Sequence, residues 1–549
     1  MIILELLVLL TSIFFFSLSF SGYGSLLTHK IKRNFFEEVF FGFLFISLIV
    51  TIIHFFLKIN FILSVFIFLI GLILFFKSLN FVYLKNLKKI EIKYLIIISL
   101  LIPMYISQKY HEDFGYYHLP YALAFLEEKI VFGFANIDNS YVYNSIWLNL
   151  TSIFFFKDKN FDFLTLPSFI LFLIFIIFLV NNLLKEKVNK VSDYYLLLIL
   201  FYFILKFTRV SEFGVDTPAI IFSILSIYYF LKYFEKNKIS EKKEIFYYNL
   251  AFSIFSVLIK LSTAPIMVLT FYLYFKNFRH LGFYIFSYRF LIIYLLFLVF
   301  FIQQFIYTGC LFFPTNLSCL DVSWFNKDYI YLSKKLELTN KSYSIAKDLY
   351  LPDEYLSNFN WFPHWIKRNY VEISEHLFTI ILPTLTFVFF QKKKEGEKII
   401  FKEKNIIYFF LFINLIFWLS FSPVYRFGVH IFVTLSFIII LDFLISRDFS
   451  KKMFTFFVLI FLLFSFSKNI FRINNTENIF IGIQKIDNKY LLKKDINSKY
   501  VKVYYPDIKN NKKNGWQGRL CWNTPFICSY NKLGIKKKNG YLIINKLEN

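Results

Sequence analysis

The stretch HEDFGYYHLP, residues 111–120, places two carboxylates and two imidazoles directly after an apolar run. Almost all of the chain on either side of it consists of apolar segments that suit membrane-spanning helices. Acidic residues at the end of such a segment indicate a functional site, because polar residues in a chain of this kind are costly. The alternative is a solvated loop that Pro120 closes, since polar residues cost little at a membrane surface.

The composition is that of a polytopic membrane protein. Of the 549 residues, 57% are hydrophobic and 80 are Phe, far outside the usage of soluble proteins. The formal net charge of +25 raises the question of nucleic-acid binding. The Lys and Arg residues, however, form short clusters between apolar runs and do not gather on one face. The positive-inside rule accounts for this pattern, so we expect no nucleic-acid partner.

The apolar runs predict an all-α polytopic fold with about 14 transmembrane helices. The first run lacks the cationic segment of a cleavable signal, so we expect it to be retained with its N-terminus outside. The pair of spans around Lys260 is the least regular, because Lys260 and Pro265 lie between its two members. The predicted spans begin near residues 2, 38, 60, 94, 164, 193, 217, 246, 264, 285, 377, 405, 427 and 453.

Charge decides which loops face the cytoplasm. The basic clusters, among them residues 85–93 and 392–394, all fall on one side of these spans, and the positive-inside rule makes that side cytoplasmic. We therefore expect a bacterial inner-membrane protein with both termini outside. The longer, motif-bearing loops then share the outer face: residues 108–163, 207–216, 308–376, 421–426 and the tail from Lys468.

The first outer loop contains two further helical segments, residues 121–130 and 143–156. The second is apolar but carries Asn144, Trp147 and Asn149, a composition typical of a helix that lies in the membrane interface. If it crossed the membrane instead, every later loop would change side and the basic clusters would lie outside. The charge pattern therefore favours an interfacial helix.

The cysteines and the tail both belong to the outer face. All four cysteines lie there, where disulfides persist. The natural pairs are the local ones, Cys310 with Cys319 and Cys521 with Cys528, although spacing alone does not fix the pairing and four free thiols are the alternative.

The tail has alternating apolar residues at 479–486, 500–505 and 541–544, bounded by Gly, Pro and Asn. It predicts a small mixed or β domain.

Two acidic sites are candidates for chemistry. Asp113, with Glu112 beside it, is placed to act as a general base or to help bind a divalent metal. Asp216 stands at the outer start of the span near 217 and is the second candidate. Its alternative role is to cap that helix, since Asp before Thr-Pro is a good N-cap.

Three cations lie at the same face. Arg209 and Arg426 occupy short outer loops, and guanidinium groups suit bidentate phosphate contacts, although snorkelling to lipid headgroups is an alternative for each. Lys260 interrupts an apolar hairpin, where an ammonium group needs a partner or an aqueous cavity. Acids and cations that converge from separate segments suit a phosphate-bearing amphiphile. The sequence contains no P-loop, dinucleotide glycine pattern, zincin motif or nucleophile elbow.

These features resemble the C-type (GT-C) polyprenyl-phosphate-dependent glycosyltransferases, which include protein O-mannosyltransferases and aminoarabinose-to-lipid-A transferases. The resemblance rests on the acid-bearing first outer loop, the interfacial helices, the Asp-Thr-Pro-Ala start of a later span at residues 216–219 and the Lys-Leu-Ser-Thr break at 260–263. The chain is also similar to a bacterial family of large polytopic membrane proteins. The stretches that carry that similarity are residues 113–119, 133–136, 143–147, 309–314, 426–428 and 521–528.

The resemblance implies roles for these residues. Asp113 matches the catalytic acid of the first loop, with Glu112 as its substitute, and Asp216 matches the acid of the second loop. Lys260 and Arg426 match positions that face the donor phosphate, and we add Arg209, Tyr117 and His118 as substrate-binding residues. The chain departs from the wider pattern in three additional spans before the first loop and in the lack of a clean Asp-Glu pair. A divalent metal, where one is used, would lie at Asp113 and Asp216; no other cofactor is implied.

The expected function is therefore transfer of a sugar from a polyprenyl phosphate to a glycan, lipid or protein acceptor in the cell envelope. The expected organisation is three additional helices in residues 1–93, a GT-C-like core in 94–468 and an extracytoplasmic domain in 469–549. Two alternatives remain open. A transporter or flippase for lipid-linked glycans would carry charges in mid-helix and paired broken helices. An O-antigen-type polymerase would carry an Arg-rich outer loop, whereas residues 308–376 offer only Arg368 beside Lys367.

Overall fold

The structure is a computed structural model of the 549-residue chain. It describes residues 2–28, 34–79, 92–107, 113–155, 163–185, 188–206, 214–313, 316–393, 401–474, 493–495, 500–505, 520–521 and 524–547. Glu112 and Arg209, both predicted site residues, lie outside these ranges, as does the predicted strand at 479–486.

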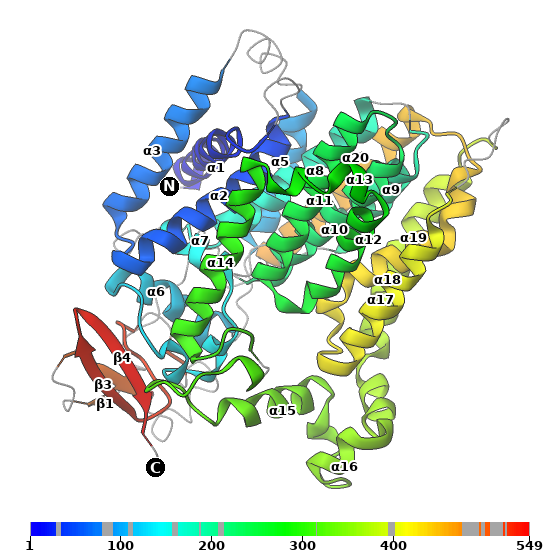
Figure 1. The fold of residues 1–549 in the computed structure, drawn as a ribbon. Coiled ribbons are helices and arrows are strands. Elements are labelled where there is room, and N and C mark those ends of the chain that lie inside the picture. Colours follow the sequence, from blue (N-terminus) through cyan, green and yellow to red (C-terminus); the bar gives the residue numbers. More distant parts are fainter. Residues whose placement is uncertain are drawn as a thin grey trace.

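The described chain is a helical assembly with two short hairpins near the C-terminus (Figure 1). Its helices are α1 (Ile2–Gly24), α2 (Phe35–Phe56), α3 (Phe61–Ser78), α5 (Ile92–Ile106), α6 (Leu119–Glu127), α7 (Ile146–Thr151), α8 (Leu166–Lys185), α9 (Val191–Lys206), α10 (Asp216–Phe234), α11 (Ile239–Ile259), α12 (Met267–Lys276), α13 (Phe278–Leu281), α14 (Tyr288–Thr308), α15 (Tyr329–Asn340), α16 (Pro352–Leu356), α17 (Trp361–Phe389), α18 (Lys404–Phe421), α19 (Val429–Ile445) and α20 (Lys451–Asn474). The strands are β1 (Lys493–Asp495), β2 (Val503–Tyr505), β3 (Leu533–Lys538) and β4 (Tyr541–Lys546).

The predicted number of spans needs correction. Within the described residues, nine helices are long and apolar enough to cross a membrane: α1, α2, α3, α8, α10, α14, α17, α18 and α20. The other five predicted spans are also helices, but α5, α9, α12 and α19 have only 10 to 17 residues and α11 begins with a charged turn. The apolar pattern therefore located helices correctly but overestimated how many have the length of a full span.

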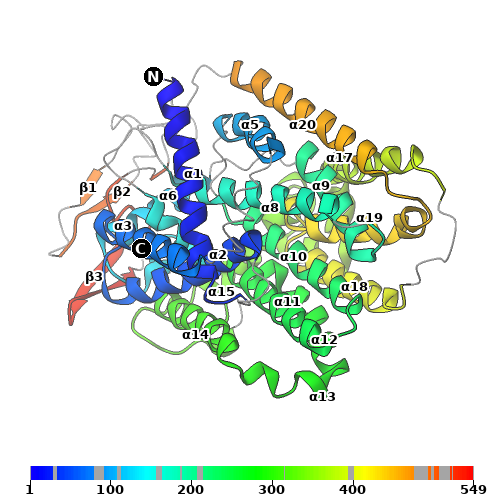
Figure 2. The same cartoon turned by 90° about the horizontal axis from the view of Figure 1, so that it is seen from above.

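The first three helices pack through glycines. α1 is seen nearly end-on in Figure 1 and lengthwise in Figure 2, so it runs across the direction of the central helices. A Cβ added to Gly22 would lie 1.8 Å from the carbonyl oxygen of Gly71 on α3, and one added to Gly42 on α2 would lie 2.0 Å from that of Phe20. The backbones touch at these crossings, as they do in membrane helix pairs with small residues at the interface.

A polar seam joins α10 to α11 inside the bundle. The hydroxyls of Ser223 and Ser256 lie 2.7 Å apart, and those of Ser226 and Ser253 lie 2.6 Å apart. All four side chains are fully buried. Hydrogen bonds between helices replace the contacts that water would otherwise make, so the seam fixes how the two helices are aligned. This alignment matters because α10 begins at Asp216 and α11 is followed by Lys260, and both residues belong to the candidate site.

The segment predicted to lie in the membrane interface, residues 143–156, forms α7 at 146–151, and this helix is buried in protein. Every residue of α7 is buried, and α7 packs on α2. Asn149 donates to Gln303 of α14 at 2.7 Å and to Thr51 of α2 at 2.9 Å, while Tyr121 of α6 donates to Asn149 at 2.7 Å. The polar residues that indicated an interfacial position are satisfied by a hydrogen-bond network with other helices. A helix that lay on a membrane surface would keep one face exposed, and α7 has none.

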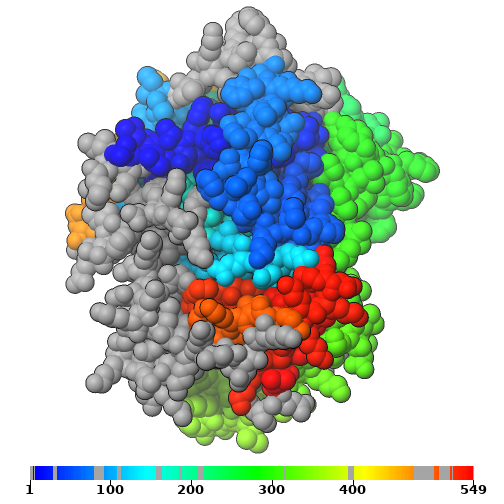
Figure 3. Space-filling model, turned by 90° about the vertical axis from the view of Figure 1, so that its left-hand side faces the viewer, coloured from blue at the N-terminus to red at the C-terminus, as the bar shows by residue number. Residues whose placement is uncertain are grey.

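The C-terminal hairpins pack against the segment between α5 and α8, as Figure 3 shows where the red strands meet the cyan segment. β1 pairs with β2 and β3 pairs with β4, both antiparallel. The amide of Ile544 donates to the carbonyl of Phe132 at 2.9 Å, and Phe132 donates back to Leu542 at 3.0 Å. Two strands therefore occur within predicted segments, at 500–505 and 541–544, and helix α20 continues to Asn474, beyond the predicted start of the tail.

Both local cysteine pairs are disulfides, Cys310 with Cys319 and Cys521 with Cys528. The first closes the turn after α14. The second closes the segment that precedes β3. In this segment the amide of Phe526 donates to the carboxylate of Glu127 at 3.0 Å. The hairpin region is thus attached to the segment between α5 and α8 by backbone and side-chain hydrogen bonds on several residues.

Candidate functional site

The site is built around Asp216, the first residue of α10. Its side chain does not cap the helix, because the N-cap position is Val215 and no side-chain cap bond forms there. The carboxylate instead makes ion pairs with two cations from other segments, Lys260 and Arg426. The capping role considered from the sequence is therefore absent, and the carboxylate is available to organise charge at the end of the helix.

Lys260 stands where α11 breaks. Its backbone is extended, and a 3-10 turn (η5, Leu261–Ile266) follows. Thr263 holds this break, because its hydroxyl donates to the Lys260 carbonyl at 2.9 Å and accepts from Ser256 at 2.9 Å. The ammonium group pairs with Asp216 and lies 3.1 Å from the centroid of the Phe427 ring. A cation over an aromatic face is stabilised by the ring quadrupole.

Arg426 occupies a 3-10 turn (η10, Tyr425–Phe427) between α18 and α19. Two indoles hold the turn: Trp365 donates to Pro423 at 2.7 Å and Trp418 donates to Val424 at 2.9 Å. The Arg426 Nε atom lies 3.3 Å from Asp216 Oδ2, and its Nη2 atom lies 3.8 Å from Asp113 Oδ2. Arg426 therefore links the two acids.

Asp113 directly precedes a π-helical turn (η1, Phe114–His118) that leads into α6. Such turns are rare and occur often at functional sites. The side chain of Asp113 is 32% exposed, as is that of Arg426, while Asp216 is 29% and Lys260 17% exposed. The four charges balance one another and remain partly accessible to solvent.

Tyr117 and His118 complete the same turn. The phenol of Tyr117 has a pKa above its ordinary value, chiefly because the group is buried and also because Asp113 and Asp216 are near. His118 is buried with its ring centroid 4.2 Å from that of Tyr117, and a Cβ placed on Gly214 would lie 3.7 Å from its Cε1 atom. Both residues therefore lie close to the acids and to the start of α10.

Burial changes the acidity of Lys260. It lowers the pKa of the ammonium group to about 8, against the opposing effect of Asp216. The group therefore titrates within reach of physiological pH. For Arg426, Asp216 and Asp113 outweigh burial and keep the pKa above its ordinary value, so the guanidinium remains charged.

Sequence reasoning missed Asp138. This residue lies in the turn at 137–140, yet only 4% of it is exposed. Its carboxylate accepts from the amide of Ser140 at 2.7 Å and from the hydroxyl of Tyr116, and burial raises its pKa. An Asp-Asn-Ser turn is usually solvated, so only the folding of this loop against other elements could have revealed that the acid is buried.

The candidate site offers few side chains that could bind a metal ion. Among the residues that the structure describes, no group of three or more His, Cys, Asp or Glu side chains is arranged to hold a metal ion. Asp113 and Asp216 are the two carboxylates that such an ion would use, and both are directed toward cations. The arrangement is better suited to binding an anion that exchanges with one of these carboxylates.

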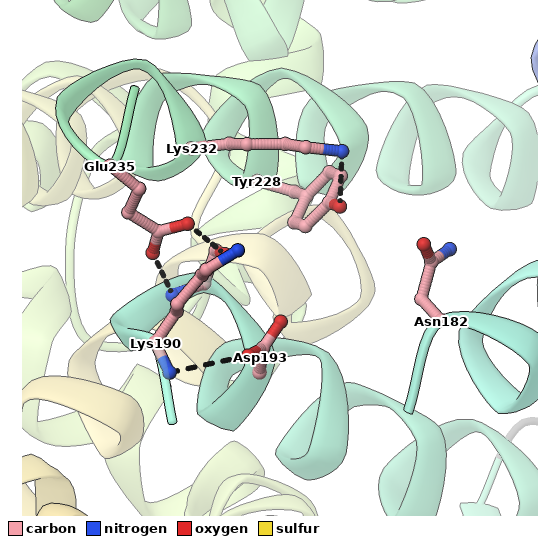
Figure 4. A pocket seen from close by; sticks show the side chains of 7 residues that line it. Asn182, Lys190, Asp193, Tyr228, Lys232 and Glu235 are labelled. Atoms are coloured by element: carbon pink, nitrogen blue, oxygen red, sulfur yellow. Dashed lines mark hydrogen bonds between the residues drawn. The ribbon is translucent and has the colours of Figure 1, made fainter. Parts of the chain in front are cut away.

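A second polar cluster lies at the opposite end of α10 and is shown in Figure 4. Glu235 accepts from the amide and the hydroxyl of Ser192, both at 2.8 Å. Asp193 accepts from the amide of Lys190 at 3.2 Å, and Lys232 donates to Tyr228 at 2.9 Å. The enclosed space is about 10 Å³, roughly enough for one water molecule. This cluster caps the start of α9.

The chain belongs to a protein family: residues 1–433 match the family described as "Domain of unknown function (DUF8201)". The match includes Asp113, Asp138, Asp216, Lys260 and Arg426 and ends before α20 and the C-terminal hairpins. No curated protein and no solved structure matches the chain.

Proposed function

For this member of the family, we propose that the outer site transfers a sugar from a polyprenyl phosphate to an acceptor hydroxyl, as an inverting glycosyltransferase of the GT-C type. The observation that carries the proposal is the meeting of Asp113, Asp216, Lys260 and Arg426, which come from four separate segments. Two acids and two cations at the end of a helical bundle provide both parts of such a reaction: anion binding and proton removal.

The donor phosphate would bind to Arg426 and Lys260. The contact between Arg426 and Asp113 is the longest ion pair in the cluster at 3.8 Å, and pairs of this length that are about one-third exposed are weak. A phosphate therefore replaces Asp113 as the partner of Arg426, while Asp216 continues to orient both cations. This exchange releases Asp113 at the moment when the donor arrives.

Asp113 then acts as general base. It takes the proton of the acceptor hydroxyl, whose oxygen attacks the anomeric carbon from the face opposite the phosphate. The bond between that carbon and the phosphate oxygen breaks, and the electron pair leaves with the polyprenyl phosphate. Lys260 and Arg426 stabilise the negative charge on this leaving group. The lipid tail stays in the bilayer throughout, so no nucleotide-binding domain is needed.

The test is sugar transfer by purified full-length protein in lipid, supplied with a panel of polyprenyl-phosphate sugars. We expect the wild type to transfer and Asp113→Asn to lose transfer. Asp353→Asn is the control, because Asp353 is an outer carboxylate on α16 with its side chain 83% exposed and a single Lys partner. We expect this variant to transfer normally.

Two results would contradict the proposal. Normal transfer by Asp113→Asn would show that another group removes the proton. Failure of the wild type to use any sugar of the panel would reject the transferase and favour the transporter or polymerase alternatives, which can be examined by following lipid-linked glycan movement or chain growth in the same vesicles.

A further inference from the structure

The C-terminal segment reaches the candidate site through one side chain. Tyr530 follows the Cys521–Cys528 disulfide by two residues, and its ring centroid lies 5.3 Å from that of Tyr116. Tyr116 lies next to Tyr117, with ring centroids 5.9 Å apart. The three rings form a row, which we call the tyrosine row, that extends from the π-helical turn after Asp113 to the C-terminal segment.

The row is not simply part of the hydrophobic core. Tyr116, Tyr117 and Tyr530 are each partly exposed, whereas the neighbouring Tyr121 and Tyr141 are buried. A core ring is covered on both faces by apolar neighbours. Rings that keep part of their surface accessible beside a cluster of charges are typical of ligand sites, which combine aromatic walls with a few oriented polar groups.

The rings are held in place by polar bonds at their hydroxyls. Tyr116 donates to Asp138, and the hydroxyl of Tyr530 bonds to the backbone of Cys521. Ser529, next to Tyr530, donates to the carbonyl of Ile137 at 2.7 Å, one residue before Asp138. The buried carboxylate of Asp138 thus positions one ring, and the disulfide-closed segment positions another. A site whose walls are fixed in this way loses little conformational entropy when a ligand binds.

The rings of Tyr116 and Tyr117 stand at 88° to each other and those of Tyr116 and Tyr530 at 52°, so they form a corner and not a flat wall. We infer that the tyrosine row binds a pyranose unit of a glycan acceptor, with the sugar ring lying on the face of one tyrosine, the other two rings bordering its edge, and its hydroxyls directed toward Asp113. The C–H bonds on one face of a pyranose suit the electron-rich faces of aromatic rings. Asp113 directly precedes the turn that carries Tyr116 and Tyr117, and its charge adds to the effect of burial in raising the pKa of both phenols. An acceptor hydroxyl at the edge of a bound sugar is therefore placed beside the proposed base.

That the bound sugar acts as the acceptor rests on the proposed function. The binding of a sugar to the tyrosine row does not, because it requires no donor. The inference also assigns the acceptor wall partly to a segment outside the family match, which ends at residue 433. The phosphate-binding groups and the proposed base lie inside the match. The acceptor side of the site is thus the part to which the C-terminal segment contributes.

The test is saturation-transfer NMR with full-length protein in nanodiscs and methyl pyranosides of glucose, galactose and mannose configuration as probes. We expect at least one probe to receive saturation from the wild type and Tyr530→Ala to reduce the signal about fivefold or more. Tyr530→Phe keeps the ring and should retain most of it. Tyr331→Ala removes a tyrosine of α15 that is 74% exposed, and should have no effect.

Folding of each variant is checked by thermal unfolding and by the mass of the disulfide-bonded C-terminal peptide. Because Tyr530→Ala can loosen the segment, Tyr116→Ala provides a second variant from a different part of the chain, with the same expected loss. Absence of any signal from the wild type, or equal signals from the wild type and both alanine variants, would overturn the inference.

The outcome can be separated from that of the proposed function. Sugar binding that depends on Tyr530, without transfer from any donor, would support the tyrosine row and reject the transferase. Transfer from a donor without sugar binding that depends on Tyr530 would support the transferase and reject the tyrosine row. If the protein both transfers sugar and binds it at the tyrosine row, Tyr530→Ala should raise the KM for the acceptor several-fold. The rate at which sugar is released from the donor to water should not change.

Discussion

The two ends of α10 carry similar side chains in different arrangements. At one end, Asp216 meets Lys260 and Arg426, which come from distant segments. At the other end, Glu235 and Asp193 accept hydrogen bonds from nearby backbone amides at the start of α9. A helix of 19 residues separates the two by roughly 28 Å.

The two clusters differ in which hydrogen bonds or ion pairs would be lost if a ligand displaced one of the carboxylates. A carboxylate that caps a helix satisfies amides that have no other partner, so displacing it leaves those groups unsatisfied. A carboxylate that pairs with a side-chain cation gives that cation a partner that an anionic ligand can replace. We therefore expect the cluster at Asp216 to exchange a partner with an anionic ligand more readily than the cluster in Figure 4.

The largest effect is expected when the proton acceptor is removed. Asp113→Asn should lower the rate of transfer at least about 100-fold, because general base catalysis contributes on the order of 100-fold to 10,000-fold. The comparison variant is Glu235→Gln at the other end of α10, which should change the rate less than twofold. Equal losses in both variants would mean that transfer depends on overall folding and that the two ends do not differ in role.

The next effect is expected in donor binding. Arg426→Lys should raise the KM for the donor about tenfold with a smaller change in kcat, because an ammonium group cannot contact Asp216 and a phosphate through a planar fork. Initial rates over a range of donor concentrations measure both constants. A KM equal to that of the wild type would place the phosphate away from Arg426.

The pH dependence should be of similar size or smaller. Lys260 is charged below its pKa of about 8 and neutral above it, so transfer should decrease as pH rises from 7 to 9, by about tenfold if the charge is essential. Asp216, Arg426 and Asp113 face this group; the pKa of Asp216 is lowered and that of Arg426 is raised, so these two keep their charges in that interval. Lys260→Arg should remain active to higher pH, and a profile unchanged by this substitution would contradict the assignment.

The smallest effect is expected from the capping cluster. Ser192→Ala removes the one hydrogen bond that the Ser192 hydroxyl donates to Glu235 and leaves the bond from the amide, and should lower the free energy of unfolding by about 1 kcal/mol. Thermal unfolding in lipid measures this change. Transfer at low temperature should match the wild type, and a specific loss of transfer would show that the two ends of α10 are functionally linked.

Much of the architecture follows from the sequence for a simple reason. Charged residues in an apolar chain are placed at the ends of helices, so Asp113, Asp216, Lys260 and Arg426 were expected at one face, and the structure brings them together. The lengths of the helices were harder to predict. Thr263 and Pro265 form a 3-10 turn before α12, which leaves that helix with only 10 residues.

Two aspects of the site depend on tertiary contacts that the sequence pattern does not contain. Asn149 suggested an interfacial helix because an isolated polar residue seeks water, but Gln303 and Thr51 satisfy it inside the protein. Asp138 is similar, since its partner Tyr116 belongs to another turn. A buried polar residue is compatible with either environment until its hydrogen-bond partner is known.

The attachment of residues 526–546 to residues 127–137 also affects how the protein is made. The ribosome completes the segment between α5 and α8 long before it reaches Tyr530, and the helices from α8 to α20 must be made in between. The tyrosine row therefore comes together only after the later helices and the C-terminal segment have been made. A chain that ends after α19 would contain Asp113, Asp216, Lys260 and Arg426 but lack Tyr530, and would therefore have only part of the tyrosine row.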